Sequence, residues 1–360
     1  MAYVDSIKTR SSNFELLRIV AMLFIIISHS SVHGGFDEIT SVLPFNSVLL
    51  DFFTLGNLGV AVFVMITGYY NIGSEFRLKK ILYLWFQVVT YSVLCLGINI
   101  LLTQSLSGEE LRRALFPVTY GRYGFFKVYT LLYIFSPFLN KMLNILSRKQ
   151  FFTLICLMFV LWSMFPTFIS RDMCGSELSR YTMYYVMGAY IRKYPDCWLN
   201  QGIRAQCCLI ILFFMFAISA IMVNIQGGRF EGRIEYFFSQ WAVFVVLTGI
   251  CLISFFGNIK LGNNLWINRI AKTTFGIYLI HDNVYMKKWI WLDWLDSRIM
   301  AESYALGFRL LVNVIIVFVV CAVVEYIRMT VCDKPFEKLY VRLSIKSKLK
   351  FFSNIKDRFV

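Results

Sequence analysis

The residues best suited to chemistry lie at the two ends of one apolar stretch near the start of the chain. Arg18 and His29 flank ten residues, of which nine are apolar. On an α-helix, eleven residues amount to three turns plus about 20°, so both side chains lie on one face, roughly 16 Å apart along the axis. A guanidinium binds anions, and an imidazole takes up protons near neutral pH. The pattern predicts a helix whose anion-binding and proton-transfer ends share one cavity.

Each of these residues also has a purely structural interpretation. Arg18 lies near the end of the stretch, where its long side chain could reach the membrane interface. His29 could be a hydrogen-bonded structural histidine at the other boundary. His29 and His33 are an i, i+4 pair of the kind that binds zinc, but no cysteine and no clear acidic third ligand lies nearby in the sequence. We therefore predict no metal site.

Further ionisable residues interrupt the apolar stretches. Glu15 precedes Arg18 by three residues and is a candidate ion-pair partner on the same helix. Asp51 and Glu325 are candidates for an internal role, because charges within membrane segments usually face a polar interior. Structural pairing of these carboxylates with Arg309 or another cation is an equally good explanation.

Composition indicates that these stretches lie in a membrane. The chain has 360 residues, of which 58% are apolar and 16% charged, and its mean hydropathy is +0.63, outside the usual range of soluble proteins. Its net charge is +15. Much of this charge lies in the C-terminal tail after the last apolar stretch, which favours anionic lipid headgroups over nucleic acid as a partner. The nine cysteines are scattered without a metal-binding or disulfide pattern.

Ten apolar stretches reach or approach the length of about 20 residues that a membrane helix needs. They cover residues 14–33, 47–70, 81–102, 124–146, 150–169, 181–193, 203–225, 236–256, 270–286 and 304–327. We predict an all-α, polytopic transmembrane helical bundle of about ten helices, with an integral-membrane domain over residues 1–330 and a basic cytoplasmic tail over residues 331–360. The distribution of Lys and Arg favours two cytoplasmic termini, and we expect a multi-pass protein of the plasma (inner) membrane.

Five segments, in order along the chain, resemble the integral-membrane acyltransferase 3 family. The segment "ELLRIVAMLFIIISH" is similar to the family's first membrane helix, in which an arginine, ten residues and a histidine recur. The other four are "GNLGVAVFVMITGYYN", "FRLKKIL", "YTLLYIFSPFLNKML" and "FGIYLIHDN". Three positions depart from the family pattern: Thr67 replaces a common serine, Lys80 the second arginine of a basic element, and Gly124 a frequent tryptophan. A lysine at position 80 lacks the planar fork of an arginine.

The resemblance implies transfer of an acyl group, most often acetyl from acetyl-coenzyme A, to a hydroxyl of a carbohydrate at the cell surface or on its lipid-linked precursor. A sugar hydroxyl needs a base near neutral pH, and we expect His29 to be that base or to form a transient acyl-histidine. Cations near the cytoplasm would bind the donor phosphates, and the candidates are Arg18, Arg77, Lys79 and Lys80. We expect no permanently bound cofactor.

The predicted supporting residues are Glu15, Asp51, Tyr69, Tyr278, His281 and Glu325. The two tyrosines are equally typical of an interfacial aromatic belt, and the family match around His281 is equally consistent with helix packing. Two other function classes remain open: a transporter or flippase of a glycan or lipid precursor, and a structural component of a polysaccharide synthesis complex. The expected partners are acetyl-coenzyme A, a carbohydrate acceptor and the lipid bilayer, and the sequence indicates no particular oligomeric state.

Overall fold

The computed structural model describes residues 12–39, 41–169, 175–197, 204–224 and 237–356, and within these ranges the chain forms helices and no strand. The predicted all-α fold class is confirmed. The longer helices are α1 (Ser12–Val32), α2 (Pro44–Phe53), α3 (Gly56–Asn71), α4 (Leu78–Thr103), α5 (Gly108–Leu115), α6 (Gly124–Ile145), α7 (Arg148–Phe159), α8 (Glu177–Lys193), α9 (Arg204–Asn224), α11 (Val243–Asn258), α12 (Leu265–His281) and α14 (Leu306–Lys356). Shorter helical segments are η1 (Phe36–Glu38), η2 (Val160–Ile169), α13 (Val284–Lys288), η4 (Trp289–Trp294) and η5 (Arg298–Met300).

All ten predicted stretches contain a helix, but the number of membrane crossings stays a prediction. By length and composition, five helical segments among the described residues are long and apolar enough to cross a membrane. They are Ser12–Glu38, Pro44–Asn71, Leu78–Thr103, Arg148–Phe168 and Leu306–Arg342. Residues 1–11 and 357–360 lie outside the described residues, so the predicted location of both termini also stays a prediction.

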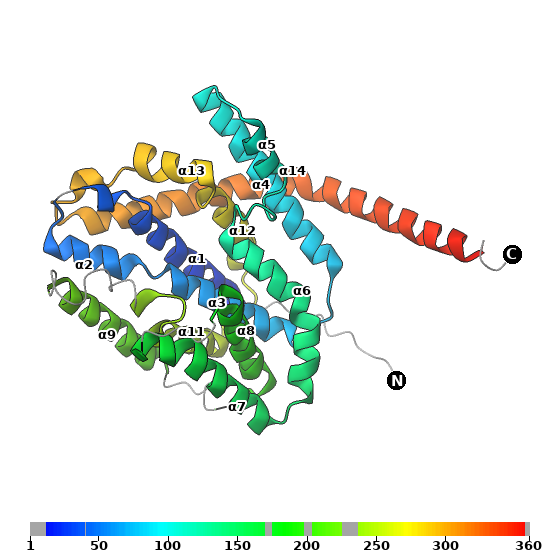
Figure 1. Ribbon diagram of the computed structural model, residues 1–360, viewed down its shortest axis with the longest axis horizontal. Helices are drawn as coiled ribbons and strands as arrows, with labels where there is room; N and C mark the ends of the chain where they lie inside the picture. The colour runs from blue at the N-terminus through cyan, green and yellow to red at the C-terminus, as the bar shows by residue number, and fades with distance from the viewer. Residues whose placement is uncertain (1–11, 40, 170–174, 198–203, 225–236, 357–360) are drawn as a thin grey trace.

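Helix α3 lies in the middle of the bundle, where it packs against α1, α8 and α11 (Figure 1). Two glycines allow α3 and α8 to cross closely. A Cβ atom on Gly68 would lie 2.0 Å from the carbonyl oxygen of Tyr185, and one on Gly188 would lie 2.0 Å from that of Met65. Small residues at helix crossings let two backbones approach in this way. The close crossing holds α8 against α3, the helix that also packs against α1.

Helices α1 and α12 run side by side in the same direction. At their first turns, the backbone N–H of Asn264 donates to Ser12 Oγ at 2.7 Å, and at their last turns His29 and His281 are in contact. Both pairs are 252 residues apart in sequence. Residues with this offset therefore lie at the same height, and we call the two ends of the molecule the Arg18 end and the His29 end.

Helix α14 runs past the predicted domain boundary at residue 330 without a break. It continues to Lys356, and Figure 1 shows its C-terminal part leaving the bundle. The boundary between an integral-membrane domain and a basic tail therefore falls inside one helix, and the tail continues that helix as far as Lys356.

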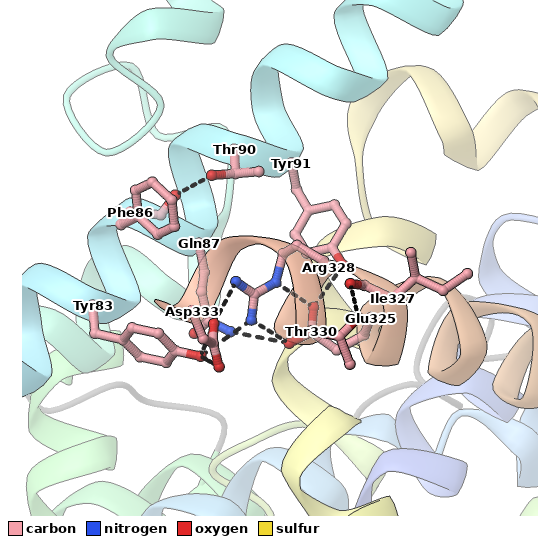
Figure 2. A network of polar contacts seen from close by, with 10 residues as sticks. All are labelled: Tyr83, Phe86, Gln87, Thr90, Tyr91, Glu325, Ile327, Arg328, Thr330 and Asp333. Carbon is pink, nitrogen blue, oxygen red and sulfur yellow. Dashed lines mark hydrogen bonds and ion pairs between the residues drawn. The ribbon is translucent and has the colours of Figure 1, made fainter. Parts of the chain in front are cut away.

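A buried polar network fastens α14 to α4 (Figure 2). The Arg328 guanidinium donates to both carboxylate oxygens of Glu325, each at 2.8 Å, and to one oxygen of Asp333 at 3.1 Å. From α4, the hydroxyl of Tyr91 donates to Glu325 at 2.6 Å and the amide of Gln87 donates to it at 3.1 Å. Both Glu325 and Arg328 are almost fully buried. Glu325, a predicted supporting residue, thus belongs to a contact between helices.

Candidate active site

One cavity of about 450 Å³ runs through the bundle, and both Arg18 and His29 line it, as their spacing on α1 predicts. Its walls come mainly from α1, α3, α4, α6, α8 and α12. Apolar side chains such as Met22, Ile25 and Phe63 line the middle of the cavity, whereas its polar groups gather toward the two ends. The cavity therefore joins two chemically different sites along one helix.

At the His29 end, two histidines from different helices form a hydrogen-bonded pair. His29 Nδ1 lies 3.0 Å from His281 Nε2, and His281 Nδ1 lies 2.6 Å from the carbonyl oxygen of Ile277. A carbonyl oxygen only accepts hydrogen bonds, so Nδ1 of His281 carries its proton and Nε2 of the neutral ring accepts from His29. In neutral His29 the proton then sits on Nδ1, and Nε2 keeps its lone pair.

A carboxylate and an amine complete this end of the cavity. Asp282 lines the cavity, and its Oδ1 lies 3.8 Å from His29 Nδ1. Lys287 Nζ lies 2.7 Å from the same oxygen. The ion pair with Lys287 keeps the negative charge of Asp282 beside the two imidazoles, where it would stabilise an imidazolium.

His29 and His33, the i, i+4 pair on α1, lack an acidic third metal ligand nearby in the sequence, and the fold brings Asp282 close to them. Ligand atoms of His29, His33 and Asp282 all lie within 4.8 Å of one another, a spacing that a metal ion could bridge. Nδ1 of His29 bonds to His281, however, and an oxygen of Asp282 bonds to Lys287. These bonds and the Lys287 ammonium compete with a metal ion for two of the ligand atoms, and the absence of a metal site stays a prediction.

At the Arg18 end, the cavity is lined by cations. Arg18 donates to Glu15 at 2.6 Å, and its guanidinium lies 5.8 Å from the ring centroid of Tyr70. Lys80 at the start of α4 and Lys272 on α12 also line the cavity, and both are exposed. Glu15 neutralises part of the charge of Arg18, so the two lysines supply most of the net positive charge at this end. This end is suited to an anion.

Two of the predicted donor-binding residues lie away from the cavity. Arg77 is exposed at the residue before α4 and is not among the lining residues. Lys79 turns toward α14, where its Nζ lies 2.6 Å from a carboxylate oxygen of Glu337 and 5.4 Å from the ring centroid of Tyr340. Among the predicted cations, Arg18 and Lys80 are the two that line the cavity.

The predicted supporting residues are likewise divided between the cavity and other contacts. Tyr278 lines the cavity, and His281 reaches it through His29. Tyr69 instead packs on Phe14, with ring centroids 4.6 Å apart, and does not line the cavity. Asp51 on α2 lies outside the lining as well. Tyr70, the neighbour of Tyr69, faces the cavity in its place.

Several lining residues were not predicted as site residues, because for most of them neither their type nor their spacing indicates that they face the cavity. They are Asn57, Tyr129, Glu177, Tyr181, Gln240 and Lys272. Lys272 and Glu177 carried a usable signal, since each is a charged residue at the edge of an apolar stretch. The offset of 252 residues between α1 and α12 places Lys272 at the height of Val20, two residues beyond Arg18.

The fold and the cavity define a class: a helical membrane protein that can bind an anion at one end of an internal cavity and move a proton at the other. The profile of the acyltransferase 3 family, described as an acyltransferase domain, matches residues 11–327. The chain therefore belongs to the acyltransferase 3 family and is a membrane acyltransferase. Comparison with curated proteins and with solved structures finds no match in either set.

Proposed function

We propose that the chain is a membrane O-acyltransferase that moves an acetyl group from acetyl-coenzyme A to a hydroxyl of a cell-surface polysaccharide or a lipid-linked oligosaccharide. One observation carries the proposal: a single cavity has cations at one end and a hydrogen-bonded histidine pair at the other. In this scheme the Arg18 end faces the cytoplasm, the His29 end faces the outside, and the protein resides in the plasma (inner) membrane.

The donor would enter from the Arg18 end. Its phosphates would bind at this end to three cations that line the cavity: Arg18, Lys80 and Lys272. The thin acyl-carrying arm would extend along the apolar middle of the cavity toward His29. Acetyl-coenzyme A is a substrate here, and no cofactor needs to stay bound between turnovers.

The chemistry would take place at Nε2 of His29. This nitrogen takes the proton of the acceptor hydroxyl while the hydroxyl oxygen attacks the thioester carbonyl. The new ester C–O bond forms, the C–S bond breaks, and the sulfur leaves as the thiol after accepting the proton from the His29 imidazolium. Asp282 would stabilise that imidazolium, and His281 would keep the lone pair of His29 on Nε2.

An acyl-histidine intermediate would use the same atom. In that route Nε2 attacks the thioester carbonyl, the C–S bond breaks, and coenzyme A leaves as a thiolate that takes a proton from water. The acceptor hydroxyl then attacks the acyl-imidazole, the ester C–O bond forms as the C–N bond breaks, and the hydroxyl proton passes to water as Nε2 regains its lone pair. Incubation with radiolabelled acetyl-coenzyme A in the absence of acceptor distinguishes the two routes, because only the second leaves label attached to the protein.

The decisive test is replacement of His29 by alanine. We expect His29→Ala to abolish acetyl transfer while the protein still accumulates in the membrane, because His29 is the one imidazole among the described residues that lines the cavity and an imidazole is best suited to take up the hydroxyl proton near neutral pH. The measurement is the mass of the surface glycan in a deletion strain carrying each variant, read as loss of the acetyl increment. His33→Ala is the matched control, since His33 does not line the cavity.

Retained acetylation in His29→Ala would refute the catalytic role of this histidine. A transporter or flippase predicts a different pattern, in which glycan export depends on the protein while coenzyme A release does not occur. Release of coenzyme A by purified protein in lipid nanodiscs therefore separates the two function classes.

A further inference from the structure

A second cavity lies at the His29 end of the molecule, between α5, the loop before α6, and α13. This α5 groove has a volume of about 380 Å³. It is lined by acidic, basic and aromatic side chains, among them Glu109, Glu110, Arg113, Tyr120, Arg122 and Tyr285. None of these residues was singled out for donor binding or proton transfer, so the groove has no role in the mechanism above.

Two chain segments line both the groove and the central cavity. In the loop before α6, Arg122 lines the groove and Gly124 lines the central cavity. After α12, Asp282 lines the central cavity and Tyr285 lines the groove. The side-chain amide of Asn283 donates to the hydroxyl of Tyr123 at 2.7 Å, which ties the two segments together. A ligand in the groove therefore lies beside the histidine end of the cavity.

The groove combines flat aromatic faces with planar hydrogen-bonding groups. The Arg122 guanidinium lies 5.0 Å from the ring centroid of Tyr285 and donates to its hydroxyl at 3.0 Å. Nε of Arg122 is buried and has no hydrogen-bond partner among the described residues. Tyr120 is 49% exposed. Sugars have C–H faces that pack on aromatic rings and hydroxyls that bond to guanidinium and carboxylate groups, so this combination suits a carbohydrate.

The charge balance of the groove argues against a phosphate ligand. Two carboxylates, Glu109 and Glu110, face two guanidiniums, Arg113 and Arg122. Arg113 already forms an ion pair with Glu109. The groove therefore has no net positive charge, whereas the Arg18 end of the central cavity has cations for the phosphates of a donor. An uncharged ligand rich in hydroxyls fits the groove best.

We propose that the α5 groove binds the carbohydrate acceptor, holding sugar residues that neighbour the one whose hydroxyl enters the central cavity. The inference rests on the proposed O-acyltransferase function and adds the acceptor subsite to it. Arg122 and Tyr285 are its principal binding residues. Because the groove shares two segments with the central cavity, the position in which Arg122 and Tyr285 bind the carbohydrate would determine which hydroxyl reaches His29.

The test measures binding and transfer separately. The probe is a set of oligosaccharide fragments from the surface polysaccharide of the source organism, freed of O-acyl groups by mild base. Binding to the full-length protein in nanodiscs is measured by isothermal titration calorimetry, and transfer is measured as coenzyme A release. The variants are Arg122→Gln and Tyr285→Ala. Arg112→Gln is the matched control, because Arg112 is an exposed arginine of α5 outside the groove.

We expect Arg122→Gln to weaken fragment binding about tenfold or more, because a charge-assisted hydrogen bond is lost. In this variant the KM for the fragments should rise by the same factor, while the KM for acetyl-coenzyme A stays unchanged. The control Arg112→Gln should bind the fragments as tightly as the wild-type protein. Tyr285→Phe, which keeps the ring, should lose less than Tyr285→Ala. Unchanged donor KM also shows that the variants are folded.

The two proposals fail in different ways. If wild-type protein does not bind the fragments, or if Arg122→Gln binds and uses them as well as Arg112→Gln does, the groove is not the acceptor site. If the fragments bind in an Arg122-dependent manner but release no coenzyme A, the groove assignment holds and the O-acyltransferase function fails. His29→Ala should bind the fragments with wild-type affinity, since the groove lies outside the reacting centre.

Discussion

At the scale of single residues, the proposed mechanism has His281 act through His29. Its Nε2 accepts a hydrogen bond from His29 Nδ1, and this bond leaves the lone pair of His29 on the nitrogen that would meet the substrate. His281 is fully buried and does not line the cavity itself. In the proposed mechanism it would therefore be a positioning residue, comparable in role to a group that orients a catalytic base.

We predict that His281→Leu lowers kcat about a hundredfold, because a positioned base contributes at least that much when its tautomer is fixed. The KM for acetyl-coenzyme A should not change, since the donor cations lie at the other end of the cavity. His281→Gln should recover much of kcat, because its amide oxygen can accept the same hydrogen bond. Equal loss in both variants, or a loss that appears in KM, would contradict a positioning role.

At the scale of elements, the crossing of α3 and α8 depends on two glycines. We predict that Gly188→Ala lowers the free energy of unfolding by about 1–3 kcal/mol or more, because the added Cβ meets backbone that cannot turn aside. The clash is with the carbonyl oxygen of Met65, at 2.0 Å. The measurement is the midpoint of thermal unfolding in detergent.

Gly97→Ala is the matched control for this substitution. Gly97 lies inside α4, and a Cβ there would meet nothing within 4 Å. Alanine at that position should stabilise the helix by about 0.5–1 kcal/mol. A similar midpoint for both variants would mean that α3 and α8 are not in close contact at Gly188.

The network of Figure 2 joins α4, which carries Lys80, to α14. We predict that Arg328→Met costs about 3–5 kcal/mol of unfolding free energy, because it leaves the buried charge of Glu325 unpaired. Adding Glu325→Gln should restore much of the loss, since the neutral amide still accepts from Tyr91. Urea or thermal unfolding of both variants checks this, and an additive effect of the two substitutions would contradict it.

The sequence predicted the local relationships in this fold and missed those set by packing. Arg18 and His29 share a face because eleven residues of one helix make nearly whole turns, which needs no knowledge of the other helices. Lys79 and Lys80 are adjacent, and about 100° of helix rotation sends one to α14 and the other to the cavity. In the same way, Tyr69 packs on Phe14 while its neighbour Tyr70 lines the cavity. Nothing local indicates how a uniformly apolar helix is rotated about its axis.

The contact between His29 and His281 shows the same limit over a longer range. The two residues are 252 positions apart, and their pairing depends on the register of α1 against α12. That register is set at the opposite end, where Ser12 bonds to the backbone of Asn264 and to the side chain of Asn268. Short polar side chains at two helix starts thus align two histidines at the helix ends. A single sequence carries no signal for that alignment.

At the scale of the whole molecule, the proposed function requires that one continuous cavity carry the acyl arm from the Arg18 end to His29. Val60 on α3 lines this cavity between the two ends, near the height at which Gly59 meets Ala21 and Ile25 of α1. We predict that Val60→Trp lowers kcat at least tenfold by filling the passage, since small displacements of reacting groups are costly. Binding of free coenzyme A, measured by calorimetry, should persist because the cations at the Arg18 end are unchanged. Val60→Ala, which widens the passage, should keep most of its activity. Full activity in a Val60→Trp variant that elutes as a folded protein would mean that the acyl group reaches its acceptor by another route.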